Sequence, residues 1–421
     1  MSSVQIDKKS GSAVPALDRQ DERLASSEGM AAGARAAWAR VRSGDLGVLP
    51  VVAGLVVIWT VFQVLNPIFL SSANLVNLAM ESAAVGTIAL GIVVVLLLGQ
   101  IDLSVGSVSG LSAAVLAVTF VNKGFPLVVA LVLCLLSGAV IGWIYGQMFN
   151  RFGVPSFVIT LAGLLGFLGL QLKLLGSAGA INIPFDSPLV NFAQLSFIPR
   201  PLAYVLGVLV AGGLFLSRWT RAVARRRAGL SAQSLPSLLV VSGLVLVAME
   251  AVIWYLNRAR GVGWMFVLFV VLVIAVNYLL TRTRWGRSVF AVGGNAEAAR
   301  RAGINVKQIY TTVFILCSTL AALGGILACA RLAAANQSTG AGDVNLNAIA
   351  AAVIGGTSLF GGRGSAYSAL LGIIVIQSIS SGLTLLNLDS SFRFMVTGLV
   401  LALAVALDSV ARRSRASHGK A

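Results

Sequence analysis

The chain has 421 residues, of which 57% are hydrophobic and 11% charged, and its formal net charge is +17. Ordinary soluble domains carry about 25% charged residues, so this composition excludes a water-exposed globular surface. A soluble chain of this length would also divide into compact cores joined by polar loops. The apolar runs instead continue almost to the C-terminus, which indicates an integral membrane protein.

A bilayer core of about 30 Å requires roughly 20 apolar residues per helix, because unpaired backbone cannot face lipid. Runs of this kind predict an all-α fold, a polytopic transmembrane helical bundle of ten to twelve spans. The predicted spans, in chain order, are 48–65, 75–98, 104–121, 126–149, 156–175, 201–217, 236–256, 264–281, 308–330, 345–359, 365–386 and 392–409. The run at 345–359 is short and rich in small residues, which is typical of a re-entrant or broken helix. We expect further helix breaks at 100–106 and 355–364.

Basic residues gather between the apolar runs, before the first and after the last. Lys and Arg concentrate on the cytoplasmic side of membrane proteins, and twelve crossings place every cluster on that side. This pattern argues against nucleic-acid binding. The clusters are Arg35, Arg40 and Arg42; Arg218, Arg221, Arg225, Arg226 and Arg227; Arg282, Arg284, Arg287, Arg300, Arg301 and Lys307; and Arg412, Arg413 and Arg415.

The charge pattern also predicts the domain organisation. Residues 1–47 are polar and form an expected disordered cytoplasmic tail. Residues 48–410 form the transmembrane domain, with cytoplasmic connectors at 218–235 and 282–307. Residues 411–421 form a cytoplasmic basic tail.

Catalytic and metal-binding patterns are missing from the sequence. The one histidine, His418, lies in the charged C-terminal tail, and none of the six lysines follows a phosphate-binding Gly-rich loop. Cys134, Cys317 and Cys329 lie inside apolar runs without metal-ligand spacing. We therefore expect no enzymatic activity, no metal and no cofactor.

Asp102 is the most informative charged residue within the apolar part. Burying a charge in lipid costs several kcal/mol, so such residues usually face a cavity or a partner. Asp102 precedes Ser104 at an expected helix start, where a carboxylate can cap free backbone amides. A structural cap and a role in a transport pathway both explain it, and the latter leaves an ion-coupled secondary carrier open.

The connector at 282–307 contains an expected short helix. Asn295 is a good N-cap, residues 296–301 form the helix with Glu297 one turn from Arg300 and Arg301, and Gly303 ends it. Such a helix is often just a solvated surface element. Held between two spans, it can also press against a cytoplasmic partner.

Four motifs in order resemble the membrane subunits of bacterial ATP-binding-cassette (ABC) sugar importers, the ribose, arabinose and xylose permease family. They are IDLSVGS at 101–107, VPSFVITLA at 154–162, AVGGNAEAARRAGINV at 291–306 and AVIGGTSLFGG at 352–362. The additional pair of spans at 236–281 resembles the xylose branch of that family. The resemblance covers about residues 70–410.

The resemblance implies a multi-pass permease of the bacterial inner membrane, with both termini cytoplasmic. The expected partners are a second copy of the subunit in a homodimer, two ABC ATPase subunits, a periplasmic sugar-binding protein and the lipid bilayer. The expected cargo is a monosaccharide, and the favoured class is a pentose such as xylose. The alternatives are another sugar, a branched-chain amino acid, the ion-coupled carrier or a membrane-embedded enzyme.

The resemblance also suggests two groups of functional residues. The expected ATPase-coupling residues are Gly293, Gly294, Asn295, Glu297, Arg300 and Gly303. The expected polar contacts along the substrate pathway are Asn77, Gln100, Asp102 and Gln171.

Overall fold

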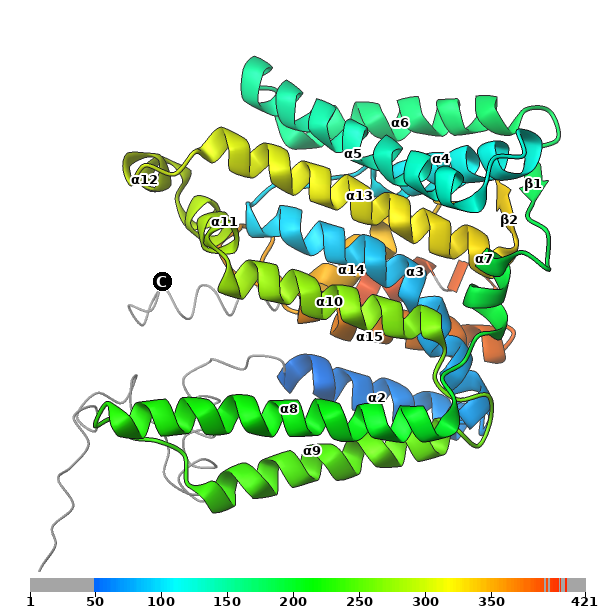
Figure 1. Ribbon diagram of the computed structural model, residues 1–421. Coiled ribbons are helices and arrows are strands. Elements are labelled where there is room, and N and C mark those ends of the chain that lie inside the picture. The colour runs from blue at the N-terminus through cyan, green and yellow to red at the C-terminus, as the bar shows by residue number, and fades with distance from the viewer. Residues whose placement is uncertain (1–48, 390, 393, 401, 403–405, 407–421) are drawn as a thin grey trace, which may run out of the picture. The chain divides into compact units, whose positions relative to one another are not determined.

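The computed structural model describes residues 49–389, 391–392, 394–400, 402 and 406. Within them, nine helices are long and apolar enough to cross a bilayer, and two shorter apolar helices accompany them. The predicted polytopic helical bundle is therefore confirmed (Figure 1). The predicted tails at 1–47 and 411–421 lie outside the described residues, as does much of the predicted span at 392–409.

The elements follow the predicted runs, except that the helix predicted at 201–217 continues to Arg227, so the first part of the predicted connector at 218–235 is helical. The first half of the chain contains α2 (Leu49–Leu65), α3 (Ser72–Leu97), α4 (Val105–Ala117) with the π-helical turn η1 (Val118–Asn122), α5 (Leu127–Phe152), α6 (Ser156–Leu175), β1 (Ala180–Asn182), α7 (Pro188–Val190), η2 (Asn191–Leu195) and α8 (Arg200–Arg227). The second half contains α9 (Leu235–Leu256), α10 (Trp264–Arg282), α11 (Arg284–Gly294), α12 (Ala296–Arg301), α13 (Val306–Leu332), β2 (Ala334–Asn336), α14 (Val344–Ile354) and α15 (Tyr367–Leu385).

The predicted interruptions occur where the sequence placed them. The helix stops at Leu97 and resumes at Val105, and it stops again at Ile354 and resumes at Tyr367. The run at 345–359 forms α14, which has 11 residues and is too short to span a bilayer. Gly153 ends α5 in the left-handed conformation at φ +65°, and Pro155 precedes the first residue of α6.

The described residues divide into two compact units. The larger contains the described residues up to Pro199 and from Tyr255 onward, and the smaller contains Arg200–Trp254. In the larger unit, α3 and α13 form the core and are the most buried of the long helices. Helix α13 packs against α3, α4 and α5. Their large buried side chains, including Leu90, Ile92 and Phe314, form one continuous apolar cluster.

Glycines allow α5 and α13 to approach closely. A β-carbon on Gly138 or Gly142 would lie 2.5 Å from the Ser318 carbonyl oxygen or 2.3 Å from that of Phe314. Glycines four residues apart lie on one helix face, and small residues at this spacing bring transmembrane helices into backbone contact. The high glycine content of the spans therefore serves helix packing at this interface.

A two-stranded sheet is the main feature that the all-α prediction missed. β1 pairs with β2 in antiparallel register, with Ile181 opposite Ala335. Both strands have only three residues, and their pairing joins segments that are far apart in the chain. In Figure 1 the sheet lies at the opposite end of the larger unit from α11 and α12.

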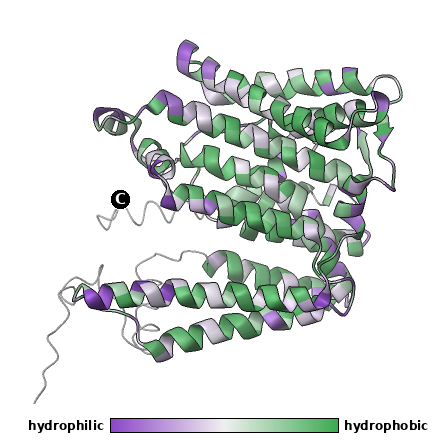
Figure 2. Ribbon diagram, viewed as in Figure 1, coloured by the Kyte–Doolittle hydropathy of each residue, from purple (hydrophilic) through white to green (hydrophobic). Residues whose placement is uncertain are grey.

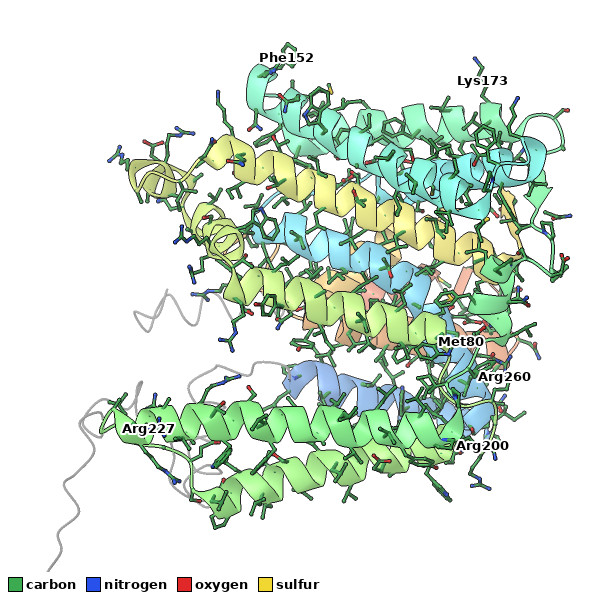
Figure 3. All side chains as sticks on the ribbon, in the orientation of Figure 1. Met80, Phe152, Lys173, Arg200, Arg227 and Arg260 are labelled. Atoms are coloured by element: carbon green, nitrogen blue, oxygen red, sulfur yellow. The ribbon has the colours of Figure 1, made fainter. Side chains whose placement is uncertain are left out.

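The smaller unit consists mainly of α8 and α9. Arg200 and Arg227 mark the two ends of α8 (Figure 3). Apolar residues cover most of both helices, and hydrophilic residues concentrate toward the Arg227 end of α8 (Figure 2). Many large side chains of this unit, such as Leu209, Leu244 and Val247, are exposed by more than half, as expected for lipid-facing helices.

Candidate functional site

The interruption between α3 and α4 is held by polar contacts from three helices. The Asp102 carboxylate accepts hydrogen bonds from Ser104 N at 2.8 Å and Ser104 Oγ at 2.7 Å. The Tyr145 hydroxyl of α5 donates to Ser104 Oγ at 2.7 Å, and Leu103 N donates to Thr160 Oγ1 of α6 at 3.1 Å. From α13, the Cys317 thiol contacts the second carboxylate oxygen of Asp102 at 3.8 Å.

Asp102 is fully buried in this network. Its carboxylate caps the backbone N–H of Ser104, which immediately precedes the first residue of α4. This contact agrees with the structural interpretation of Asp102. The side chain therefore stabilises the non-helical turn, because buried backbone amides without a partner are costly.

A cavity of about 340 Å³ lies beside this interruption. Its volume is within the range of about 300–1,000 Å³ that is typical of small-molecule pockets. Ser107 and Asn345 supply polar side chains, and Asn345 Oδ1 also accepts a hydrogen bond from Gly106 N. The remaining lining comes from the turn before α4, from α6, from the loop before α14 and from α14 itself: Leu103, Leu164, Leu165, Leu168, Gly340, Ala341, Gly342, Leu346 and Ile349.

Gln171 lies further along the contact between α4 and α6. Its side-chain N–H donates to the carbonyl oxygens of Asn336 at 3.0 Å and Thr339 at 2.9 Å. The residue is fully buried, yet its Oε1 atom has no hydrogen-bond partner among the described residues. Gly110 packs directly against this oxygen, because a β-carbon there would lie 2.3 Å away.

The four predicted pathway residues do not converge on one site. Asn77 of α3 accepts a hydrogen bond from the Arg260 guanidinium, and Gln100 is half-buried in the turn after α3. None of Asn77, Gln100, Asp102 or Gln171 lines the cavity, although Asp102 and Gln171 lie on either side of it along α4 and α6. The cavity residues Ser107 and Asn345 were not among the sequence candidates. Ser107 ends the IDLSVGS motif, which is the one signal that could have identified it.

The expected short helix in the connector at 282–307 is α12, with the predicted bounds. Asn295 Oδ1 accepts from Ala298 N at 2.9 Å, and Gly303 has φ +84° after the helix end. Glu297 pairs with Arg300 at 2.9 Å and with Arg301 at 3.3 Å, and all three side chains are more than half exposed. On the opposite face Ala299 is buried, so α12 is anchored on one side and open on the other.

Helix α11 connects α12 to the helix interruptions. Its Trp285 Nε1 atom donates to Thr312 Oγ1 of α13 at 2.8 Å. At its other end, Gly293 contacts the C-terminal end of α3 and the loop after α14. Gly362 N donates to the Leu97 carbonyl oxygen at 2.8 Å, and a β-carbon on Gly361 would lie 2.8 Å from Gly99 N.

We call this contact the glycine junction and define it as Leu97, Gly99, Gly293, Gly361 and Gly362. It brings three segments into backbone contact: the end of α3, the end of α11 and the loop between α14 and α15. The sequence pattern identified Gly293 as a coupling residue and Gly361 and Gly362 as part of a helix break. It did not indicate that these residues touch.

Comparison with known proteins places these features in a family. The family model described as "Branched-chain amino acid transport system / permease component" matches residues 74–405. The chain is 33% identical to the xylose transport system permease protein XylH of Escherichia coli K12 over 89% of its own length and 94% of that protein. It is 30% identical to the ribose import permease protein RbsC of the same strain, over 84% of this chain and 91% of that protein. The probable ABC transporter permease protein YphD of that strain is 33% identical over 89% of this chain and 92% of its own length. No solved structure matches the chain.

Proposed function

The chain belongs to the permease-component family of branched-chain amino acid transport systems, with ABC sugar permeases among its relatives, and we propose that it forms the translocation pathway of an ABC importer for a monosaccharide. A pentose, with xylose first, is the proposed cargo. Two relatives carry names for xylose and ribose transport, and both sugars are pentoses. The identity of about 30% leaves other sugars and amino acids as outcomes of the test.

The observation that carries this proposal is the mechanical connection from α12 to the helix interruptions. An ATP-driven permease must transmit movement of a separate ATPase to its own spans. Helix α12 is exposed on its Glu297 and Arg300 face, and α11 joins it to the glycine junction. The junction in turn borders the turn that contains Asp102 and leads into α4. A displacement of α12 by the ATPase would therefore be transmitted through these backbone contacts to the helices that line the cavity. This supports a role of α12 in alternating access.

The proposed assembly contains two copies of this chain, two ATPase subunits on the face with α12, and a sugar-binding protein on the opposite face. The proposed coupling residues are Gly293, Gly294, Asn295, Glu297, Arg300 and Gly303. We place α12 and the Arg-rich end of α8 on the cytoplasmic side, as the positive-inside rule requires. The two crossings by α9 and α10 return the chain to the side on which α8 ends, in agreement with this placement.

The pathway proposal centres on the cavity with Ser107 and Asn345. Its mainly apolar lining and few polar groups suit weak, transient sugar contacts, because a conduit must release its cargo. Asp102 and Gln171, whose Oε1 has no partner among the described residues, remain proposed pathway residues beside the cavity. Asn77 and Gln100 are proposed to contact the sugar elsewhere along the pathway, outside the cavity.

Uptake by reconstituted vesicles tests this function. The chain is reconstituted with and without its ATPase subunit, which is identified by co-purification. Radiolabelled xylose is supplied with the binding protein, and unlabelled ribose, other sugars and branched-chain amino acids are tested as competitors. ATP-dependent accumulation that requires the ATPase supports the proposal. Accumulation by the chain alone under a proton or sodium gradient would instead identify an ion-coupled carrier.

A further inference from the structure

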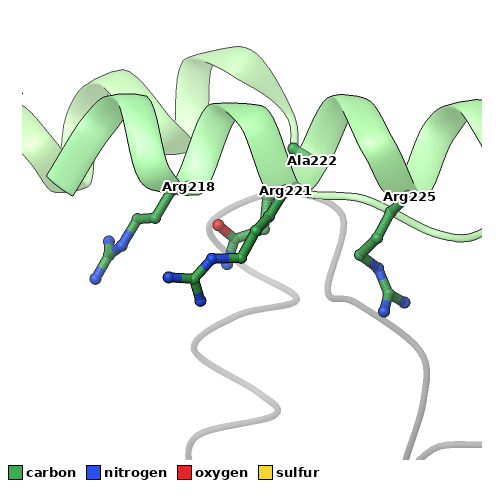
Figure 4. Close-up of a pocket in the computed structure, with 5 residues that line it drawn as sticks. Arg218, Arg221, Ala222 and Arg225 are labelled. Carbon is green, nitrogen blue, oxygen red and sulfur yellow. The ribbon is translucent and has the colours of Figure 1, made fainter. Parts of the chain in front are cut away.

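The cytoplasmic end of α8 carries a compact arginine pocket that the transport proposal does not use. Arg218, Arg221 and Arg225 follow one another at spacings of three and four residues, which places them on one helix face. Together with Ala222 and Gln233 they line a hollow of about 340 Å³ (Figure 4). We name these five residues the arginine pocket.

The connector after α8 folds back and gives the pocket a fixed shape. Ala222 and Ala232 are buried and pack in one apolar cluster with Leu238 of α9. Arg225 Nε donates to the Ser231 carbonyl oxygen at 2.7 Å, and a guanidinium N–H of Arg226 donates to the Gln233 carbonyl oxygen at 2.9 Å. These two arginines thus hold the connector in place.

Arg218 and Arg221 carry positive charges, and no carboxylate residue lies near them in the sequence. The chain contains no Asp or Glu between Asp186 and Glu250, and five arginines fall within that interval after position 217. Arg221 contacts the neutral Ser217 hydroxyl at 2.8 Å, and both Arg218 and Arg221 are exposed. Guanidinium groups bind phosphate well, because their planar donors match its oxygens.

The surroundings favour a phosphate that belongs to a lipid. The pocket lies at the end of an apolar helix whose side chains Leu214 and Leu216 are exposed. Trp219 lies between Arg218 and Arg221 in the sequence and stacks on Phe215 with ring centroids 6.4 Å apart. Aromatic rings of this kind are enriched at the headgroup level of a bilayer. Basic pockets on the cytoplasmic side of transmembrane helices commonly bind anionic headgroups.

We propose that the arginine pocket binds the headgroup phosphate of an anionic phospholipid, with Arg218 and Arg221 as the main ligands. The pocket goes beyond a general positive-inside signal because the folded-back connector and the arginine spacing give it a defined geometry. An anionic lipid bound there would hold the end of α8 at the membrane surface.

Native mass spectrometry of the purified full chain tests the proposal, with phosphatidylglycerol as the probe and zwitterionic phosphatidylcholine as the reference lipid. The wild type should retain phosphatidylglycerol preferentially. The double variant Arg218→Gln/Arg221→Gln should bind it about thirtyfold more weakly, as expected for two lost surface charges. The matched control Arg227→Gln/Arg282→Gln removes two exposed basic charges elsewhere and should bind as the wild type does. Arg218→Lys/Arg221→Lys keeps both charges but not the planar donors, so it should bind more tightly than the glutamine variant and more weakly than the wild type; binding as weak as that of the glutamine variant would indicate a folding defect.

Equal weakening in both double glutamine variants would show a diffuse charge effect and overturn the proposal. Displacement of the lipid by millimolar inorganic phosphate would also overturn it, because the pocket would then be a site for soluble anions. The measurement needs neither sugar nor ATPase, so its outcome is independent of the proposed transport function.

Discussion

Gly293 and Leu97 lie in backbone contact: a β-carbon on Gly293 would come within 1.8 Å of the Leu97 carbonyl oxygen. That oxygen already accepts the hydrogen bond from Gly362 N. The contact leaves no room for a side chain. This contact joins the end of α11 to the end of α3. It therefore lies at the centre of the coupling route proposed above.

Gly293→Ala should impair coupling. The added methyl group must displace the end of α11 or the end of α3, and overpacking of this kind costs about 1–3 kcal/mol. We expect ATP-dependent uptake to fall at least about tenfold while the chain still inserts into the membrane. Gly169→Ala on α6 is the matched control, because no atom of the described residues lies within 4 Å of a β-carbon at Gly169. Equal uptake by the two variants would remove the glycine junction from the coupling route.

Asn295→Ala should weaken ATPase association. The loss of an N-cap costs about 0.5–2 kcal/mol, and α12, with six residues, has little other helical stability. Asn305 caps α13 in the same way, by accepting from Gln308 N at 3.1 Å. Asn305→Ala should have a smaller effect, because α13 has 27 residues and extensive packing. Co-purification of the ATPase with each variant measures the difference, and similar losses in both would contradict the assigned role of α12.

Glu297→Gln should affect the partner more than the fold. The Glu297 pairs with Arg300 and Arg301 are exposed, and such pairs contribute about 0.2–1 kcal/mol. The thermal stability of the isolated chain should therefore change little, while sugar-stimulated ATP hydrolysis by the complex falls. Normal hydrolysis and uptake by this variant would show that α12 is only a solvated surface helix.

Asp102 variants should separate its structural role from a role in the pathway. Asp102→Asn can still accept the Ser104 N–H, whereas Asp102→Ala leaves buried groups without a partner at a cost of about 1–3 kcal/mol. We expect the alanine variant to be clearly less stable than the asparagine variant in thermal unfolding. If Asp102 also serves the pathway, Asp102→Asn reduces uptake although its stability is retained. Equal stability of the two variants would contradict the structural role.

Gly142→Leu should prevent assembly of the larger unit. The side chain would enter the backbone contact with Phe314 on α13, where a β-carbon already comes within 2.3 Å of a carbonyl oxygen. Gly166→Leu on α6 is the matched control, because no atom of the described residues lies within 4 Å of a β-carbon there. Size-exclusion profiles of the purified variants give the readout, and a monodisperse Gly142→Leu protein would show that the α5–α13 contact is not essential.

Local features were predictable from the sequence. The bounds of α12 followed from a capping residue, an ion pair one turn away and a glycine, all within nine positions from Asn295 to Gly303. The break before α4 and the short α14 followed from the length of the apolar runs and their glycine content. The family motifs identified the class of protein, as the comparisons confirm.

Long-range contacts were not predictable in this way. The glycine junction joins Leu97, Gly293 and Gly362, and no local pattern in one segment indicates which other backbone it meets. The pairing of Ile181 with Ala335 was missed for the same reason, since each strand has three residues and no strand-like alternation long enough to detect. The cavity residue Asn345 lies in the run at 345–359, which is short and rich in small residues. These two properties predicted a broken helix but no cavity.

The central claim is that this chain conducts a sugar and that a separate ATPase supplies the energy. Vesicles that contain the purified chain alone, with an imposed ion gradient and no nucleotide, test it most directly. The account predicts no accumulation of radiolabelled xylose above the external concentration, and accumulation once the ATPase, the binding protein and ATP are added. Uphill uptake by the chain alone would contradict it.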